Sequence, residues 1–349
     1  MTKPLGDLDF VLNTIRAADA FQRCPDYRPT PLIQRAVTGE TLWLKDERNR
    51  LGLGSFKALG GAYAIARLVA HAAGTTDNAG PMDPRMREAA KAITFVCASA
   101  GNHGLSVAAG ARLFGARARV HLPLSAPPEF QRRIRAEGAA VLLSGETYDD
   151  AMRAARDDAA RDGGVWLSDC AFSTYEIGPA LVMEGYTLIA REMAHQFAAA
   201  DSWPTHIFVQ AGVGGLAAAL AYEVRTAWTR QPELVVVEPE TAACVAAAVT
   251  DPQAVETAGP SSIMHRLDCK RASSMAARVL KAARASFVSV SDDEAERAAA
   301  MLAQAGFATT PSGAAGLAGL IRHSPDEDAR PAIIITEDSM NPESGDAHA

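Results

Sequence analysis

Short apolar segments rich in β-branched residues alternate along the first half of the chain with Ala-rich segments that have a helical period. The pattern predicts strands at 93–98, 117–122, 139–143 and 165–168, and helices at 102–114, 128–137 and 147–161. Gly115, Gly138 and Gly163 stand where these helices are expected to end. Strands that alternate with helices in this way form a parallel sheet with helices on both faces.

A second series of the same kind follows. It comprises strands at 206–210, 234–238, 287–290 and 332–336, and helices at 186–197, 216–228, 292–305 and 312–321. The stretch 251–262 is expected to be a loop, and the polar tail after Met340 to be frayed. The fold class is therefore α/β, with two lobes and a ligand-binding cleft between them.

Composition narrows the functional classes. The chain has 349 residues, which is long for one core, and its net charge of −7 argues against nucleic-acid binding. Apolar runs are too short to span a membrane, and the N-terminus lacks a signal-peptide pattern. The five cysteines form no C-x-x-C pair, and the eight histidines show no metal-ligand spacing. We expect a cytoplasmic protein with reduced thiols and without a metal, nucleic-acid or membrane partner.

Lys57 is the first candidate for chemistry, because it joins the glycine-rich turn 52–54 to an apolar helix start. Most lysines lie on solvated surfaces. Here the neighbours Phe56, Ala58 and Leu59 are apolar, and burial among them would lower the pKa of the amine. A neutral amine is the nucleophile that attacks a carbonyl carbon.

A second motif lies between strand 93–98 and helix 102–114. It consists of Ser99, Ala100, Gly101, Asn102 and His103. The N–H groups at a helix N-terminus bind anions, so the loop can hold a substrate carboxylate, and Asn102 can hydrogen-bond a ring hydroxyl. The alternative is that Ser99 or Asn102 only caps the helix and that His103 only packs.

A third motif again follows a strand and opens a helix. It consists of Gly212, Val213, Gly214, Gly215 and Leu216. A glycine loop at a helix N-terminus binds phosphate. Taken alone, the loop equally fits a dinucleotide site, with Glu238 as the acid that binds the ribose. The combination favours the first interpretation, because a dinucleotide enzyme has no need of the two upstream motifs.

Together the motifs resemble those of fold-type II pyridoxal 5′-phosphate (PLP) enzymes, the family of threonine dehydratases and serine racemases. The resemblance rests on Ser55-Phe56-Lys57, Ser99-x-Gly101-Asn102-His103 and Gly212-Val213-Gly214-Gly215-Leu216, in that order. Further stretches resemble the diaminopropionate ammonia-lyases, among them Tyr148-Asp149-Asp150, Glu184-Gly185-Tyr186 and Ser312-Gly313-Ala314. The similarity extends from about Pro31 to Thr336.

The resemblance implies the architecture of the tryptophan synthase β subunit. Two three-layer α/β/α lobes with mainly parallel sheets would flank a cleft. A large PLP-binding domain would contain residues 1–92 and 173–349, and a small substrate-side domain residues 93–172. The family also implies a homodimer.

The resemblance further assigns roles to residues. Lys57 would carry PLP and act as the base at Cα, and the 212–216 loop would bind the phosphate. Asn102 would bind the ring hydroxyl and Thr336 would face the pyridine nitrogen. The substrate carboxylate would lie on Ser99, Ala100, Gly101 and His103. Asp169 matches an acidic position of the ammonia-lyase pocket and is a candidate proton donor to the leaving group; its alternative is a strand-end cap.

Three positions depart from the ammonia-lyase pattern. Ala100 replaces an aspartate that the family uses for proton removal from D-isomers, so we expect a strong preference for L-substrates. His265 and Arg266 replace small residues. They would either reshape the pocket or favour an acidic substrate side chain; the alternative is that both are exposed loop residues.

The predicted function is an ammonia-lyase that catalyses α,β-elimination on a small L-amino acid and yields an oxo acid and ammonia. A dehydratase of L-serine, L-threonine or 3-hydroxyaspartate would use the same residues with another leaving group. An NAD(P)-dependent oxidoreductase using the Gly212 loop is the alternative from another class, and a catalytically silent PLP-binding protein is a third.

Overall fold

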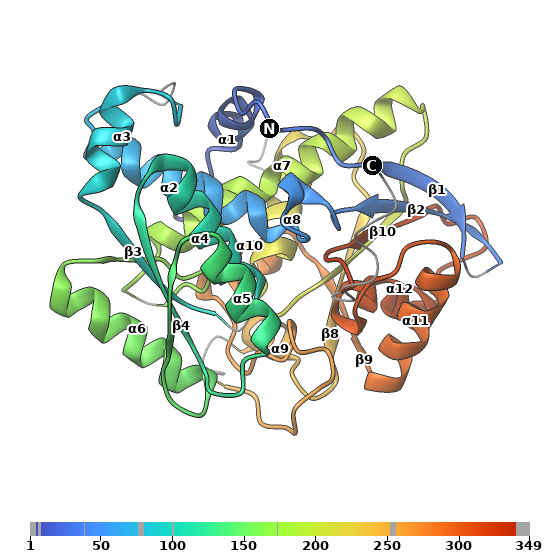
Figure 1. Cartoon of the computed structure of the whole chain (residues 1–349). Coiled ribbons are helices and arrows are strands. Elements are labelled where there is room, and N and C mark those ends of the chain that lie inside the picture. Colours follow the sequence, from blue (N-terminus) through green and yellow to red (C-terminus); the bar gives the residue numbers. More distant parts are fainter. Residues whose placement is uncertain are drawn as a thin grey trace.

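The computed structural model describes residue 5 and residues 8–37, 39–75, 80–99, 101–172, 174–251 and 256–339 (Figure 1). Two sheets organise this part of the chain. One has six strands and the other has four, and helices pack on both. The α/β class and the mainly parallel sheets predicted from the sequence are confirmed.

The four-stranded sheet is wholly parallel and has the order β5-β4-β3-β6. Its strands are β3 (Thr94–Ala98), β4 (Arg117–Leu122), β5 (Ala140–Leu143) and β6 (Val165–Trp166), and its helices are α4 (Asn102–Phe114), α5 (Pro128–Ala136) and α6 (Tyr148–Asp162). Alternate residues of β3 face opposite sides. Phe95 and Cys97 pack in the main core, whereas Val96 and Ala98 pack against α6. The lobe is therefore a three-layer α/β/α unit.

The six-stranded sheet has the order β1-β2-β10-β7-β8-β9. Its strands are β1 (Leu32–Ala36), β2 (Thr41–Asp46), β7 (His206–Gln210), β8 (Glu233–Pro239), β9 (Ser286–Val290) and β10 (Pro331–Ile335). Strands β1 and β2 pair antiparallel, and the remaining pairs are parallel. The sequence pattern did not predict the β1–β2 hairpin, because the half-exposed β1 offers no clear apolar run.

Helices cover both faces of the large sheet. One face packs against α11 (Asp292–Gln304) and α12 (Pro311–His323), and the opposite face against α7 (Ile177–Ala199), α8 (Gly215–Ala227) and α10 (Ser274–Ala282). The other helices are α1 (Thr14–Gln22), α2 (Lys57–Ala72), α3 (Pro84–Lys91), α9 (Cys244–Thr250) and the short 3₁₀ helix η1 (Arg50–Gly52).

Helix α7 starts well before the predicted residue 186. The prediction began the helix after Gly185, because glycine often ends helices. Here Gly185 lies inside the helix, at a position where α2 leaves no room for a side chain. A Cβ at Gly185 would approach the carbonyl oxygen of Leu59 to 2.7 Å. The glycine thus allows close packing of α2, the helix that begins at Lys57, against α7.

A buried ion cluster fixes the segment that leads from β2 to α2. Lys45 Nζ lies 2.6 Å from Glu192 Oε2, and Arg50 lies 2.7 Å from both Glu47 and Glu192. All four side chains are almost fully buried. Because each charge has a partner at hydrogen-bond distance, the cluster ties β2 and η1 to α7 without leaving a buried charge unpaired.

The ends of the strands determine where a ligand would bind. Strands β3, β7 and β10 all lead, at their carboxyl ends, into the motifs that the sequence singled out. In parallel sheets these ends are where ligands bind. Among the described residues, no helix is long and apolar enough to cross a bilayer.

Candidate active site

Lys57 is held by the turn that precedes α2. Gly54 has a φ of +76°, a left-handed conformation that favours glycine. The N–H of Phe56 donates to the carbonyl oxygen of Thr336 at 3.1 Å, and the N–H of Lys57 donates to Ser55 Oγ at 3.2 Å. The turn is thereby attached to the residue that follows β10, so the position of Lys57 depends on the large sheet.

Asp169 reaches Lys57 from the other lobe. It lies just after β6, and its Oδ2 is 2.5 Å from Lys57 Nζ. The side chains are 20% and 12% exposed, so both are enclosed but reachable by solvent. The structure thus joins two predicted site residues from different sheets in one ion pair.

This pair changes the expected protonation of Lys57. Burial alone disfavours the ammonium, but the Asp169 carboxylate more than offsets it and holds the pKa of Lys57 above its ordinary value. Burial would also raise the pKa of Asp169, yet Lys57 holds it below its ordinary value. The predicted lowered pKa of Lys57 is therefore wrong for this state. It was inferred from neighbours in sequence, whereas Asp169 is 112 residues away.

His103 lies behind Asp169. Its Nε2 is 3.0 Å from the carbonyl oxygen of Leu167, and its Nδ1 is 4.0 Å from Asp169 Oδ2. Burial lowers the pKa of His103 in spite of the nearby carboxylate. A neutral ring that donates from Nε2 to a carbonyl must carry a lone pair on Nδ1. This buried Nδ1 has no hydrogen-bond partner among the described residues, so its lone pair is free to accept a hydrogen bond.

Asn102 is positioned by an acid that the sequence analysis missed. Its Nδ2 donates to Glu337 Oε2, and Thr310 Oγ1 donates to the other oxygen of the same carboxylate. Glu337 is buried and follows Thr336 directly. A polar residue one position beyond a buried strand looks like an ordinary strand end, so no sequence signal marked it.

The Ser99 side chain makes local hydrogen bonds within the loop between β3 and α4. The Ser99 hydroxyl lies 3.1 Å from the N–H of Gly101 and 3.2 Å from its carbonyl oxygen. In this position the hydroxyl shapes the loop but does not cap the helix. Among the described residues no side chain caps α4, whose N-cap is Gly101, so the alternative that Ser99 or Asn102 caps the helix is wrong. Ala100 lies outside the described residues.

The glycine loop between β7 and α8 exposes a series of N–H groups. Within the described structure, no hydrogen bond is donated by the backbone N–H of Gly212, Val213, Gly214, Gly215 or Leu216. Gly214 has a φ of +95°, and a Cβ there would lie 3.0 Å from Ala276 Cβ. Free N–H groups at the start of a helix of this length form an anion-binding site.

Thr336 is oriented by Gln210. Gln210 Nε2 lies 3.2 Å from Thr336 Oγ1 and 2.9–3.2 Å from the carbonyl oxygens of Ser312, Gly313 and Ile334, so its two protons are shared among four acceptors. Because the Thr336 oxygen accepts one of these shared protons, its own proton is available to a ligand atom that accepts.

Two tyrosines complete the surroundings of Lys57. Tyr186, whose ring lies 4.9 Å from Phe56, has a buried hydroxyl without a hydrogen-bond partner in the described part of the chain. Tyr148 is 41% exposed, yet burial, followed by the Asp169 carboxylate, raises the pKa of its hydroxyl well above the ordinary value. The sequence supported both tyrosines only through the family resemblance.

Known proteins are similar to this chain over most of its length. The family model described as pyridoxal-phosphate dependent enzyme matches residues 24–337. The diaminopropionate ammonia-lyase of Salmonella typhimurium is 35% identical over 286 residues, which are 78% of this chain and 70% of that protein.

Solved structures agree. The diaminopropionate ammonia-lyase of Escherichia coli, in complex with an aminoacrylate-PLP azomethine reaction intermediate, superposes with a TM-score of 0.84 and 26% identity and covers 99% of this chain and 92% of that chain. Threonine deaminase from Solanum lycopersicum has the same fold, with a TM-score of 0.77 and 20% identity over 95% of this chain and 90% of that chain.

This chain belongs to the family of pyridoxal-phosphate-dependent enzymes. Its fold is that of the fold-type II group, and its cofactor is PLP.

The residues of this PLP enzyme fit the cofactor. The free N–H groups of the 212–216 loop match a phosphate, the amine of Lys57 matches an aldehyde, and the available proton of Thr336 matches an unprotonated pyridine nitrogen. Asn102 is bound to Glu337, the residue that directly follows Thr336.

Membership of the PLP-dependent family excludes the oxidoreductase alternative. In the structure Glu238 binds backbone N–H groups of the chain itself. Its carboxylate accepts the N–H groups of Val245 and Ala246 at 2.7 and 2.9 Å, at the start of α9. Burial, opposed by these two bonds, raises the pKa of Glu238 to about 7. Both carboxylate oxygens bind the chain itself, so Glu238 does not serve a ribose.

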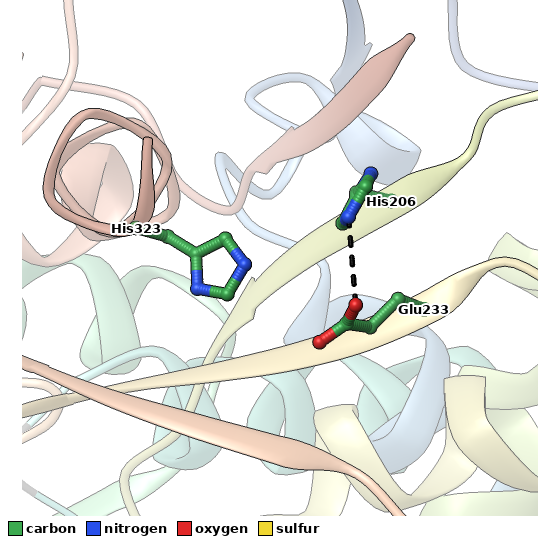
Figure 2. A group of neighbouring side chains, drawn as sticks. All are labelled: His206, Glu233 and His323. Carbon is green, nitrogen blue, oxygen red and sulfur yellow. Dashed lines mark ion pairs between the residues drawn. The ribbon is translucent and has the colours of Figure 1, made fainter. Parts of the chain in front are cut away.

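A further group of potential metal ligands lies at the opposite edge of the large sheet. Figure 2 shows His206, Glu233 and His323, whose ligand atoms lie within 4.8 Å of one another. The sequence spacing missed them because they come from β7, β8 and α12. Glu233 is exposed, pairs with His206 at 3.5 Å and accepts from Ser286. These contacts account for the group without an ion, and we assign no metal to it.

Replacing Asp169 with Asn tests the ion pair. In the cofactor-free protein, Asp169→Asn leaves the burial of Lys57 but removes its counter-charge, so the pKa of Lys57 should fall below its ordinary value. The amine would then be neutral at lower pH than in the wild type. The pH dependence of Lys57 acetylation, followed by peptide mass spectrometry, measures the change. The exposed Asp157→Asn is the control and should leave the profile in place; an unchanged profile in Asp169→Asn contradicts the assignment.

Replacing Gly214 tests the anion site. Gly214→Ala introduces a Cβ at a φ of +95° against Ala276, which should force the loop out of the conformation that presents its N–H groups. The left-handed conformation costs about 1–2 kcal/mol for a non-glycine residue, so we expect a PLP dissociation constant raised roughly fivefold or more. Gly306→Ala is the matched control, since Gly306 has a φ of +89° but open space around it. Equal PLP affinities of the two variants, measured by absorbance titration, would contradict the assignment of the 212–216 loop as the phosphate site.

Proposed function

We propose that this chain is an ammonia-lyase that catalyses α,β-elimination on a small L-amino acid and yields an oxo acid and ammonia. The observation that carries the proposal is the Lys57–Asp169 pair, an amine and a carboxylate 2.5 Å apart in the cleft of a PLP enzyme. The identity of 35% with a diaminopropionate ammonia-lyase supports the same reaction class.

Residues from both lobes would hold the cofactor. The N–H groups of the 212–216 loop would bind its phosphate, Asn102 its ring hydroxyl and Thr336 its pyridine nitrogen. Lys57 would hold it covalently. A neutral hydroxyl at Thr336 would leave the pyridine nitrogen largely unprotonated, which moderates its electron-withdrawing effect.

Lys57 would act as the base at Cα. When bound, PLP supplies an aldehyde that links to amines and an electron sink for the Cα–H bond that breaks. A base must be neutral before it accepts a proton, and Asp169 Oδ2, at 2.5 Å from Nζ, is the group to which Lys57 can pass one. The pair would therefore move a proton directly between Lys57 and Asp169 within the cleft.

Asp169 would protonate the leaving group. Its low pKa depends on the charge of Lys57, since burial alone acts in the opposite direction. Whenever Lys57 is neutral, the pKa of Asp169 rises and the carboxyl can hold the proton that the leaving group needs. His103 Nδ1 lies 4.0 Å from Asp169 Oδ2, beyond hydrogen-bond distance, so it would accept from the protonated carboxyl only after a small movement of either side chain.

The substrate would lie between the two lobes. The N–H groups at the start of α4, with Ser99, Ala100, Gly101 and His103, would bind its α-carboxylate. Ala100 has no acid with which to remove a proton from the opposite face. The proposal therefore includes a preference for L-isomers.

Three broader statements belong to the same proposal. The two separate sheets support a division into a large domain, 1–92 and 173–349, and a small domain, 93–172. The family resemblance supports a homodimer. Five free cysteines are consistent with a cytoplasmic location, where thiols stay reduced.

Product analysis tests the function. We expect the PLP-loaded enzyme to release ammonia together with pyruvate from L-diaminopropionate or L-serine, or the corresponding oxo acid from a substituted substrate, and to act far more slowly on the D-isomers. Lys57→Ala should abolish release, because it removes both the covalent link and the base. Release of no ammonia from any L-amino acid would refute the proposal, and fast turnover of a D-isomer would refute the one-base part of it.

A further inference from the structure

Arg266 lies where the two halves of the site meet. A Cβ at Gly212 would approach its carbonyl oxygen to 2.9 Å, so its backbone borders the phosphate loop. A Cβ at Gly101 would approach its Nε to 3.0 Å and its Cζ to 3.1 Å, so its guanidinium borders the loop expected to bind the substrate carboxylate. Its neighbour His265 is exposed, which confirms for His265 alone that it is a surface loop residue.

The guanidinium is held in place but has hydrogen-bond donors to spare. It stacks on the ring of Phe130, with Cζ 4.5 Å from the centroid, and the backbone N–H of Arg266 donates to Ser312 Oγ at 3.1 Å. Arg266 forms a loose ion pair with Glu337, with Nε 3.7 Å from Oε2, which is too long for a hydrogen bond; the same oxygen accepts from Asn102. Nε is buried and has no hydrogen-bond partner among the described residues.

Such a group selects among substrates by charge. A guanidinium offers paired N–H donors that match a carboxylate, whereas it repels an ammonium group in the same cleft. The β-amino group of diaminopropionate is a cation in its ordinary form, and a carboxylate on Cβ is an anion. At contact distance, the interaction energies of opposite and of like charges differ strongly when water is partly excluded.

We propose that Arg266 binds a carboxylate attached to Cβ, so that the preferred substrates are β-substituted dicarboxylic amino acids such as 3-hydroxyaspartate. This inference rests on the proposed elimination function and specifies its substrate class. The α-carboxylate would occupy the start of α4, and the second carboxylate would lie on the Arg266 side of Gly101.

The reaction balances without an added oxidant or reductant. With L-3-hydroxyaspartate, the Cα–H and Cβ–O bonds break and water leaves, with the proton passing through Lys57 and Asp169 to the hydroxyl. The four-carbon enamine product takes up a proton at Cβ, and one water then replaces its nitrogen. The net conversion is 3-hydroxyaspartate to oxaloacetate and ammonia, and the water lost equals the water gained.

Substrate selectivity of the holoenzyme tests the inference. The values of kcat/KM are compared for L-3-hydroxyaspartate, L-diaminopropionate and L-serine in the wild type and in Arg266→Gly and Arg266→Lys. We expect Arg266→Gly to lower kcat/KM for 3-hydroxyaspartate roughly 10- to 100-fold, the effect of losing a charged hydrogen bond, while the values for the other two substrates hold or rise. Arg266→Lys should retain part of the selectivity.

Arg284→Gly is the matched control. Arg284 is exposed, follows α10 at the opposite edge of the sheet and has a φ of +53°, a conformation that glycine adopts readily. The change removes the same charge, so it should leave all three substrates unaffected. Calorimetry with unreactive ligands gives a second readout: succinate should bind the wild type more tightly than propionate, and Arg266→Gly should remove the difference.

The outcomes separate the two proposals. Equal losses for all substrates in Arg266→Gly would show that Arg266 binds the α-carboxylate and would overturn the inference. Turnover of diaminopropionate but not of 3-hydroxyaspartate would overturn it while the elimination function stands. Turnover of no amino acid would refute the function, and the succinate comparison would then still decide whether Arg266 forms a second carboxylate site.

Discussion

The contact between Lys57 Nζ and Asp169 Oδ2 joins the two halves of this enzyme. Lys57 begins α2 and is tied through Phe56 to the end of the large sheet, whereas Asp169 follows the last strand of the small sheet. The 2.5 Å separation therefore reports how the two sheets sit against each other. Because each group shifts the pKa of the other, a movement of one lobe relative to the other would change both pKa values.

The two groups regulate each other through charge. The ammonium keeps the pKa of Asp169 low, and the carboxylate keeps the pKa of Lys57 high. The raised pKa of Lys57 contributes stability that is lost as pH rises through it, and the lowered pKa of Asp169 contributes stability that is lost as pH falls through it. The cofactor-free pair is thus fully formed between the ordinary carboxyl and ammonium values, roughly pH 4 to 10. Neutralising one member frees the other for acid–base work.

The sequence predicted what depends on local pattern. Helix Asn102–Phe114 and strands Arg117–Leu122 and His206–Gln210 have the predicted boundaries, because their apolar periods and glycine stops are local signals. The motifs also located Lys57, Asn102 and the 212–216 loop. Contacts across the fold could not be predicted. Asp169 reverses the expected pKa of Lys57, and Glu337 fixes Asn102 from 235 residues away. Arg266 was noticed only as a departure from a family pattern, and its place beside Gly101 required the structure.

The central claim is that Lys57 carries the cofactor. Lys45 and Lys270 are engaged elsewhere, Lys45 in the buried ion cluster and Lys270 with Asp268. The most direct measurement is borohydride reduction of the purified holoenzyme, which fixes PLP to the amine that holds it, followed by digestion and peptide mass spectrometry. The account predicts the phosphopyridoxyl group on the peptide containing Lys57. A label on another lysine, or no label at all, would contradict it.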